Sequence, residues 1–283
     1  MEQIFITILL YSLGLGLILA LMTGLTLILT RTSSPLLRYR ILVFLLASFA
    51  LGTVTIGFRA IESATEASQT VSRGTEKTFH IQQDNNSPAQ VSIFKQGYHL
   101  LNSNSRIIAL IWLLIVVIKS IKLGSNLLEL HYLKTRKIFP AGEYWETRLE
   151  QLSKKIGLNK TVKIMQSGII QVPVVIGHFK PVILIPLGMI TAIKPQEIEM
   201  MLLHELAHIK RMDFLANMMQ HILELLFFFN PAVLWTSALI RKERENCCDE
   251  MVLQSAASKQ SYIQALLSFK EYQLRVPAYA MAF

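Results

Sequence analysis

The residues of this chain best suited to chemistry are two histidines and a glutamate within LHELAHIKRMD, residues 203–213. His204 and His208 are four residues apart, so on a helix both imidazoles project from one face and can bind the same metal ion. Glu205 stands beside them and can hold or deprotonate a metal-bound water without being a ligand itself. This spacing predicts a site for one zinc ion at which Glu205 acts on a bound water.

A catalytic zinc needs a third protein ligand and one open coordination position. The candidates downstream are Asp213, His221, Glu224, Glu243, Glu245, Cys247 and Cys248. Glu245 and Asp249 are one helical turn apart, so Glu245 can bind the zinc while Asp249 accepts the second N–H of a ligand histidine. Glu243 would point to the opposite helix face, because two residues rotate a side chain by about 200°. Asp213 is predicted to cap the next helix instead.

The segment between the two parts of this site is strongly apolar, with Asn230 and Pro231 near its middle. A single membrane crossing would leave His204 and Glu245 on opposite sides. The sequence therefore predicts a membrane-proximal helical hairpin over residues 213–250 that reverses at Asn230-Pro231. An ordinary buried pair of helices fits the same pattern equally well.

Elements of a soluble domain precede this hairpin. Periodicity and turn residues predict helices over 143–158 and 195–211, and strands over 161–166, 169–177 and 181–186. Prolines at positions 173, 181 and 186 suit strand ends or an edge of a sheet. We therefore expect PVILIP, residues 181–186, to form an exposed edge strand. Val182, Ile183 and Leu184 would pair there with an extended peptide substrate.

The composition is that of a membrane protein, with 52% hydrophobic and only 17% charged residues. Uncharged or nearly uncharged runs predict three transmembrane helices, at about 4–29, 41–58 and 107–123. A cleavable signal peptide is an alternative for the first run. The absence of a basic segment before that run, and its length, disfavour this alternative.

Basic residues orient these predicted spans, because lysine and arginine resist translocation. The short loop 30–40 and the segment 119–137 are rich in them and are expected to be cytoplasmic, whereas loop 59–106 is expected to be extracytoplasmic. We therefore predict a membrane region over 1–128 and a cytoplasmic-side domain over 129–283. The net charge of +9 fits contact with lipid headgroups. Direct nucleic-acid binding is not expected, because the sequence lacks a module that combines aromatic and basic residues.

Taken together, the three spans and the segments GHFKPVILIP, HELAHIKRMD, FFFNPAVLW and RKERENCCDE resemble the BlaR/MecR family of membrane zinc metallopeptidases, the β-lactam sensor-transducers and their relatives. The resemblance implies a membrane α-helical bundle plus an α+β gluzincin-type zinc peptidase domain with a small β-sheet. It also implies a multi-pass protein of the bacterial cytoplasmic membrane whose catalytic site faces the cytoplasm. The carried-over roles fall on His204, His208 and Glu245 as zinc ligands and on Glu205 as base.

The physiological act that this resemblance implies is signal-triggered cleavage of the protein itself or of a cytoplasmic transcriptional repressor. The family's sensor-transducers continue into a further span and a penicillin-binding sensor, whereas this sequence stops at AYAMAF and contains no serine and lysine acylation motif of that sensor. β-Lactam recognition is therefore not supported, and the end is expected to be interrupted rather than complete.

Two alternative functions remain, together with one unassigned role. The chain could be a protease of membrane-protein quality control or processing, or a non-catalytic receptor with a structural metal site. Glu205 beside an open site with three ligands argues against the receptor, because a structural zinc usually has four protein ligands. His178, His221 and Tyr262 are candidates for stabilising the oxyanion.

Overall fold

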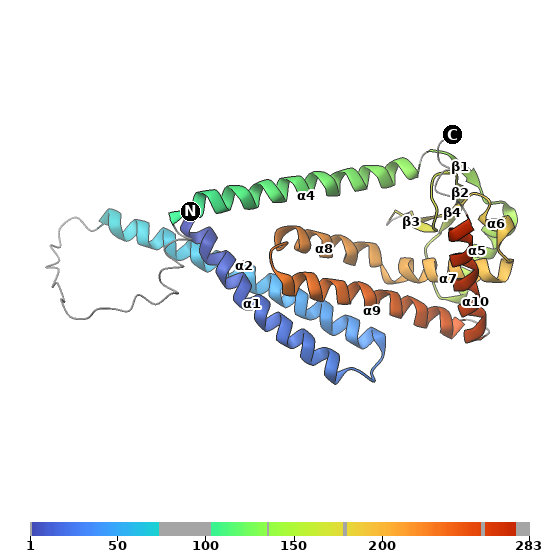
Figure 1. Cartoon of the computed structure of the whole chain (residues 1–283), viewed down its shortest axis with the longest axis horizontal. Coiled ribbons are helices and arrows are strands. Elements are labelled where there is room, and N and C mark those ends of the chain that lie inside the picture. Colours follow the sequence, from blue (N-terminus) through green and yellow to red (C-terminus); the bar gives the residue numbers. More distant parts are fainter. Residues whose placement is uncertain (1, 74–102, 135, 178–179, 256–257, 276–283) are drawn as a thin grey trace. The chain divides into compact units, whose positions relative to one another are not determined.

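The computed structural model describes residues 2–73, 103–134, 136–177, 180–255 and 258–275 (Figure 1). The chain forms two compact units. The apolar unit comprises residues 1–32, 40–120 and 223–238, and the sheet unit comprises residues 33–39, 121–222 and 239–283. The helices are α1 (Glu2–Leu29), α2 (Pro35–Arg73), α4 (Ser105–Leu133), α5 (Glu143–Lys155), α6 (Met189–Ala192), α7 (Pro195–Arg211), α8 (Asp213–Leu226), α9 (Pro231–Ser255) and α10 (Lys259–Arg275). The strands are β1 (Ile138–Pro140), β2 (Lys163–Ser167), β3 (Val174–Ile176) and β4 (Val182–Pro186).

Among the described residues, three helices are long and apolar enough to cross a membrane, and they contain all three predicted spans. The apolar stretches are Phe5–Leu29, Pro35–Ser63 and Ser105–Glu129. Few of their side chains are buried, as expected of a surface that lipid would cover. Helix α2 continues to Arg73, so the first part of the predicted loop 59–106 is helical. Its alanines and glutamates favour a helix; residues 74–102 lie outside the described part.

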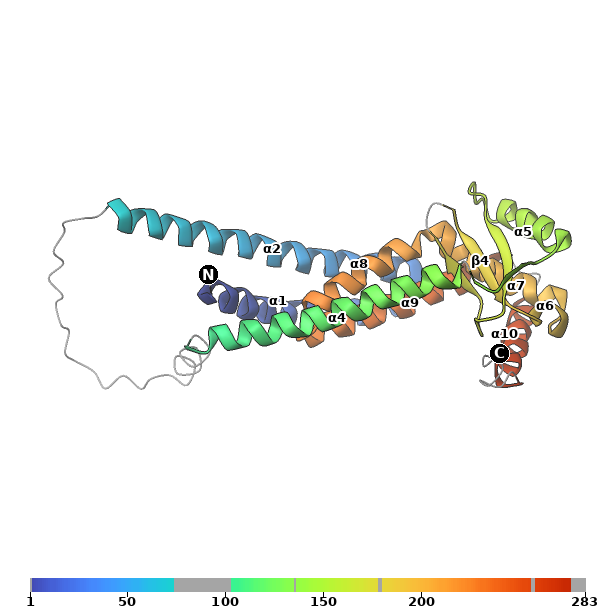
Figure 2. The ribbon, with the colours of Figure 1, turned by 90° about the horizontal axis from the view of Figure 1, so that it is seen from above.

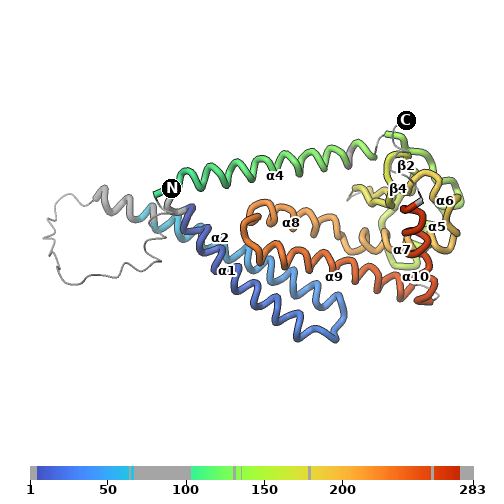
Figure 3. The backbone as a smooth tube through the Cα atoms, viewed as in Figure 1, coloured from blue at the N-terminus to red at the C-terminus, as the bar shows by residue number. Residues whose placement is uncertain are grey.

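The turn between α8 and α9 is held against α1 inside the apolar unit, and Figure 3 shows this reversal of the backbone. The buried Asn230 side chain donates to the Ser12 carbonyl oxygen at 2.9 Å and accepts from the Ala232 backbone N–H at 3.1 Å. Gly16 makes room for it, since a Cβ there would lie 2.5 Å from Asn230 Nδ2. The chain therefore reverses at the Asn230-Pro231 pair that the sequence indicates.

The sheet unit contains a four-stranded sheet in the order β1-β2-β4-β3. β2 and β4 are parallel, and the other two pairs are antiparallel. The predicted edge strand is thus wrong: β4, which carries Val182, Ile183 and Leu184 and is labelled in Figure 2, lies between β2 and β3 in the strand order. Ile183 and Leu184 are fully buried. An uninterrupted apolar run is typical of a strand covered on both faces, and the prolines mark only its ends.

The edges of the sheet are β1 and β3. β3 is shorter than the predicted strand 169–177, and β1 was not predicted. A hydrophobic core joins the sheet to α5 and α7, made largely of aliphatic side chains: Trp145, Leu149, Leu152, Ile164, Ile183, Ile185, Ile198, Leu202 and Leu206. Helix α7 starts with Pro195, where a missing N–H costs nothing, and its apolar face packs on this core. The rest of its surface is left to carry the two histidines.

Candidate metal centre

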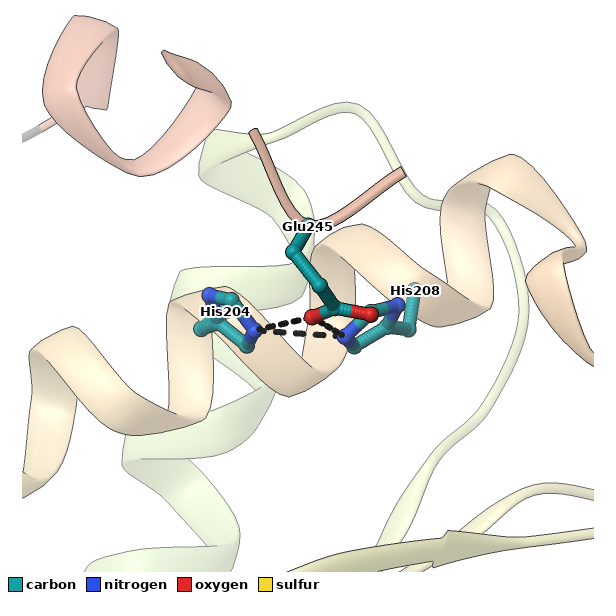
Figure 4. Close-up of side chains that lie close together, drawn as sticks. All are labelled: His204, His208 and Glu245. Atoms are coloured by element: carbon teal, nitrogen blue, oxygen red, sulfur yellow. Dashed lines mark hydrogen bonds and ion pairs between the residues drawn. The ribbon is translucent and has the colours of Figure 1, made fainter. Parts of the chain in front are cut away.

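His204 and His208 lie one turn apart on α7, with their imidazoles turned toward each other (Figure 4). Their Nε2 atoms are 3.2 Å apart. Glu245 of α9 reaches the same point: its Oε2 lies 3.5 Å from His204 Nε2 and 3.4 Å from His208 Nε2. The three atoms belong to α7 and α9, which are far apart in the sequence. They lie at the corners of a nearly equilateral triangle.

The triangle fits a tetrahedral zinc ion. Zinc binds imidazole nitrogen and carboxylate oxygen at about 2.0–2.1 Å, so two ligand atoms of one tetrahedral ion are about 3.3 Å apart. The measured separations of 3.2, 3.4 and 3.5 Å scatter around that value. Without a cation, two ring nitrogens and a carboxylate oxygen would be an electrostatically poor grouping unless the rings were protonated. The donor set and its geometry therefore suit zinc, with one coordination position left over.

That remaining position opens onto a hollow of about 370 Å³. Glu205 lines this hollow together with both histidines and Glu245. Its other walls come from β3 and the residues beside it, from the start of α8 and from Arg244. A second, apolar hollow of about 170 Å³ also borders His204 and Glu205. It is lined by Val172, Pro173, Met201, Tyr262, Leu266 and Phe269.

Comparison with known proteins gives a family match and several bacterial relatives. The family described as BlaR1 peptidase M56 matches residues 5–281. The chain belongs to this family. It is 26% identical over 203 residues to the regulatory protein BlaR1 of Staphylococcus aureus, an alignment that covers 71% of this chain and 34% of the relative. It is 32% identical over 124 residues to the regulatory protein BlaR1 of Bacillus licheniformis, covering 43% of this chain and 20% of the relative.

A third relative is the methicillin resistance mecR1 protein of Staphylococcus aureus, 31% identical over 112 residues, or 39% of this chain and 19% of the relative. The chain thus covers a fifth to a third of these curated relatives. Its bacterial relatives and its three candidate membrane helices make this M56 family member a bacterial membrane protein.

In this M56 family chain, a carboxylate stands behind the first histidine. Asp249 Oδ1 lies 3.1 Å from His204 Nδ1, where the sequence places it, one turn beyond Glu245. The buried Tyr262 hydroxyl donates to the same oxygen at 2.7 Å. A proton held on Nδ1 by this carboxylate leaves the Nε2 lone pair free for a metal. Tyr262, considered above for the oxyanion, therefore lies behind the histidine and orients Asp249.

A second carboxylate stands behind the other histidine and was not assigned this role from sequence. His208 Nδ1 and Asp213 Oδ2 are 2.8 Å apart, and Asp213 is almost fully buried. Asp213 does begin α8, but no capping hydrogen bond of its side chain is seen in the described residues. Met212 adopts a left-handed conformation with φ 57° that ends α7 and turns the chain back. No local pattern signals this turn, because methionine rarely adopts it.

Cys248 adds a further donor near His208, since its Sγ lies 3.4 Å from both His208 Nδ1 and Asp213 Oδ2. These three residues form a second group that could hold a metal. The 2.8 Å contact between Nδ1 and the carboxylate is that of a hydrogen bond, which leaves Nδ1 protonated and unable to bind a cation. The grouping of His204, His208 and Glu245 is therefore the better metal site.

The electrostatics of the metal-free site are those of two protonated histidines around a carboxylate. Burial alone would lower the pKa of His204, but hydrogen bonds to Asp249 and Glu245 outweigh it and raise the pKa to about 9. Burial is likewise outweighed at His208, whose contacts with Asp213, Cys248 and Glu245 raise its pKa to about 12. Hydrogen bonds from both histidines hold the pKa of Glu245 far below its usual range. Burial raises the pKa of Glu205, with the histidines opposing that shift.

The other acidic candidate, Glu243, lies away from this site, as the helical rotation predicts. Its carboxylate is buried rather than solvated, and it pairs with Arg38 at 2.8 Å while accepting a hydrogen bond from Asn246. His221 lines a separate hollow beside Glu129. His178 lies outside the described residues.

Proposed function

We propose that this protein is an integral-membrane zinc metalloendopeptidase with a gluzincin-type site. His204, His208 and Glu245 would hold one zinc ion, and Glu205 would be the catalytic base. The observation that carries the proposal is the triangle of two Nε2 atoms and Oε2, with sides of 3.2, 3.4 and 3.5 Å, beside Glu205 and open to a hollow. Three ligands and an open position also argue against a purely structural metal.

Bound zinc would supply Lewis acidity, polarising the scissile carbonyl and making a water easier to deprotonate. Glu205 would accept the proton of the attacking water and pass it to the departing amine. Its burial keeps its pKa above that of an ordinary glutamate, which favours a base that must later release its proton. Asp249 and Asp213 would fix the two imidazoles so that both Nε2 atoms stay aimed at the metal.

The substrate would be an extended peptide segment lying along β3, which replaces β4 in this role. β3 is an edge of the sheet, and Val174 and Val175 line the hollow that also contains Glu205. An edge strand offers backbone groups to which a peptide can add as a further strand. An apolar side chain next to the scissile bond would enter the smaller hollow between Met201 and Leu266.

We further propose that the site faces the cytoplasm, with a membrane region over 1–128 and a peptidase domain over 129–283. The basic loop 30–40 supports this orientation. The name of the BlaR1 relatives, regulatory protein, supports a regulatory role, which we propose to be signal transduction. The physiological reaction would be cleavage of the protein itself or of a cytoplasmic transcriptional repressor. A broad range of unrelated substrates would instead favour a protease of quality control.

The proposal is tested by comparing the purified full chain with Glu205→Gln, using a fluorogenic peptide library in detergent. Loss of the base should lower the cleavage rate by roughly 10² to 10⁴ while zinc content stays at one ion per chain. Glu146→Gln on the exposed face of α5 removes the same charge and should leave the rate unchanged. Equal cleavage by Glu205→Gln and the parent would reject the enzymatic assignment.

A further inference from the structure

Another hollow of the sheet unit, of about 540 Å³ and apart from those described above, is surrounded by four lysines: Lys134, Lys160, Lys163 and Lys180. The rest of its lining is Thr161, Pro181 and Val182, so no acidic side chain is among the described lining residues. None of the four ammonium groups has a hydrogen bond or ion pair within the described part of the chain. Four such charges around one space repel each other, and an anion there would remove the repulsion.

The fold gathers these lysines from positions far apart in the sequence. β2 and β4 are parallel, with Lys163 opposite Val182, so the residues entering both strands meet at one end of the sheet. The backbone N–H of Lys163 also donates to the Pro181 carbonyl oxygen. Lys134 follows the last residue of α4. Its ammonium group lies beside Gly177, since a Cβ added to that glycine would be 3.7 Å from Lys134 Nζ. The cluster is thus built by sheet topology and is not a run of charges along one segment.

Lysine is a compact point charge with three donors, and it commonly binds phosphate groups. A phosphate in this hollow could meet several ammonium groups at once, and the Thr161 hydroxyl adds a donor from the same lining. A phosphate of this kind belongs either to a phospholipid headgroup or to a soluble phosphate compound.

Features of the end of α4 favour the lipid. The candidate span ends at Glu129, and Lys134 follows it by five residues, a rise of about 7.5 Å. The headgroup layer on each side of the hydrocarbon core is about as thick. The exposed Tyr132 lies between Glu129 and Lys134 in the sequence, and its ring centroid is 5.2 Å from the Arg136 guanidinium. Such a pairing of an aromatic with a basic residue suits the membrane interface. Leu128, one turn earlier, is 73% exposed, as a lipid-facing residue would be.

We propose that the four-lysine hollow binds the phosphate group of an anionic phospholipid, in the leaflet that meets the C-terminal end of the α4 span. The site is separate from the candidate metal centre, so it does not depend on the protein being a peptidase. It also gives the sheet unit a preference for anionic over zwitterionic lipid.

The test is native mass spectrometry of the detergent-purified full chain, given equal amounts of phosphatidylglycerol and phosphatidylcholine. The parent should retain phosphatidylglycerol preferentially. Each lysine near an anionic surface changes affinity by roughly five-fold, so Lys160→Gln with Lys163→Gln should weaken phosphatidylglycerol binding by about 25-fold. The matched control is Lys259→Gln with Lys270→Gln, two exposed lysines of α10, which should bind like the parent. Circular dichroism checks that both double variants are folded.

The proposal is overturned if the first double variant retains phosphatidylglycerol as well as the control does, or if phosphatidylcholine binds equally to the parent. A third arm adds excess inorganic phosphate at constant ionic strength. Undiminished lipid binding supports the phospholipid, and complete displacement assigns the hollow to a soluble phosphate compound instead.

Discussion

Two groups of polar side chains, one in each unit, differ in whether all of their polar atoms pair with other groups of the protein. At the turn between α8 and α9, Asn230 satisfies its amide with Ser12 and Ala232, and the hydroxyls of Thr23 and Thr236 lie 3.0 Å apart. These groups are neutral, buried and paired within the protein.

The group around His204, His208 and Glu245 is arranged in the opposite way. Its outer atoms are paired, His204 Nδ1 with Asp249 and His208 Nδ1 with Asp213, while the inner Nε2 and Oε2 atoms converge on one point. Only protons or a cation can occupy that point favourably. The comparison shows that a polar cluster whose atoms all pair within the protein serves packing, whereas one whose inner atoms converge on a single point indicates a binding site.

The largest difference should come from removing one of the converging atoms. Glu245→Gln should weaken zinc binding by more than about 100-fold, because it removes a ligand rather than a supporting carboxylate. Glu243→Gln, two residues away, should keep its zinc. Its buried pair with Arg38 means that it should instead lower the free energy of unfolding. Zinc content after dialysis against a weak chelator, with thermal melting, measures both. An empty site in Glu243→Gln and a filled one in Glu245→Gln would contradict the assignment.

A smaller effect is expected from the carboxylates behind the histidines. Asp213→Asn and Asp249→Asn should each weaken zinc binding about 10- to 100-fold, since an amide can offer Nδ1 an oxygen but no charge. Asp213→Asn should also destabilise the fold more, because Asp213 is buried and Asp249 is half-exposed. Competition with a fluorescent zinc indicator gives the affinities. Parent-like affinity in both variants would mean that these carboxylates do not orient the ligands.

The stability of the polar group around Asn230 should depend on how well its neighbours fit it, and not on zinc. Gly16→Ala places a methyl group against Asn230 and should cost about 1–3 kcal/mol of stability. Gly14→Ala, on the same helix with nothing within 4 Å, is the matched control and should be neutral or slightly stabilising. Zinc affinity should be unchanged in both. Thermal melting in detergent distinguishes them, and equal melting temperatures would show that the fit at Gly16 is unimportant.

The smallest effect is the dependence on pH. In the metal-free protein, the pKa values of His204 and His208 are raised from 6.5 to about 9 and about 12. Their contribution to stability is therefore fully present below about pH 6.5 and is lost as pH rises through 9 toward 12. Zinc needs neutral imidazoles, so its binding at pH 7 should release about two protons and strengthen as pH rises toward 9.

This release is measured by calorimetry in two buffers of different ionisation enthalpy. Identical heats in the two buffers, which would mean no proton release, would show that the histidines are already neutral in the metal-free state.

The sequence predicted the features of this fold and site that depend on neighbouring residues, but not those that depend on distant ones. Helical spacing anticipated which faces of α7 and α9 meet, so Glu245 and Asp249 lie near the histidines and Glu243 does not. Apolar runs anticipated the long helices, and the helix predicted over 143–158 is present as α5, which ends at Lys155 shortly before Gly157 with its φ of 71°. These features depend on residues within one or two helical turns.

Features that depend on distant residues were not predicted. The role of Asp213 requires the left-handed turn at Met212, which no residue type there favours. The interior position of β4 depends on β3 pairing with its outer side, and the terminal prolines fit an edge and a covered strand equally well. The Asn230 contact joins residues 218 positions apart. Each of these is decided by tertiary packing, which a local pattern does not contain.

The central claim is that one zinc ion is bound by His204, His208 and Glu245. X-ray absorption at the zinc edge tests it directly on the purified, zinc-loaded full chain. The account predicts two imidazole nitrogens and light oxygen ligands at about 2.0–2.1 Å with no sulfur. A sulfur at about 2.3 Å would place the ion with Cys248, His208 and Asp213, and would contradict the account.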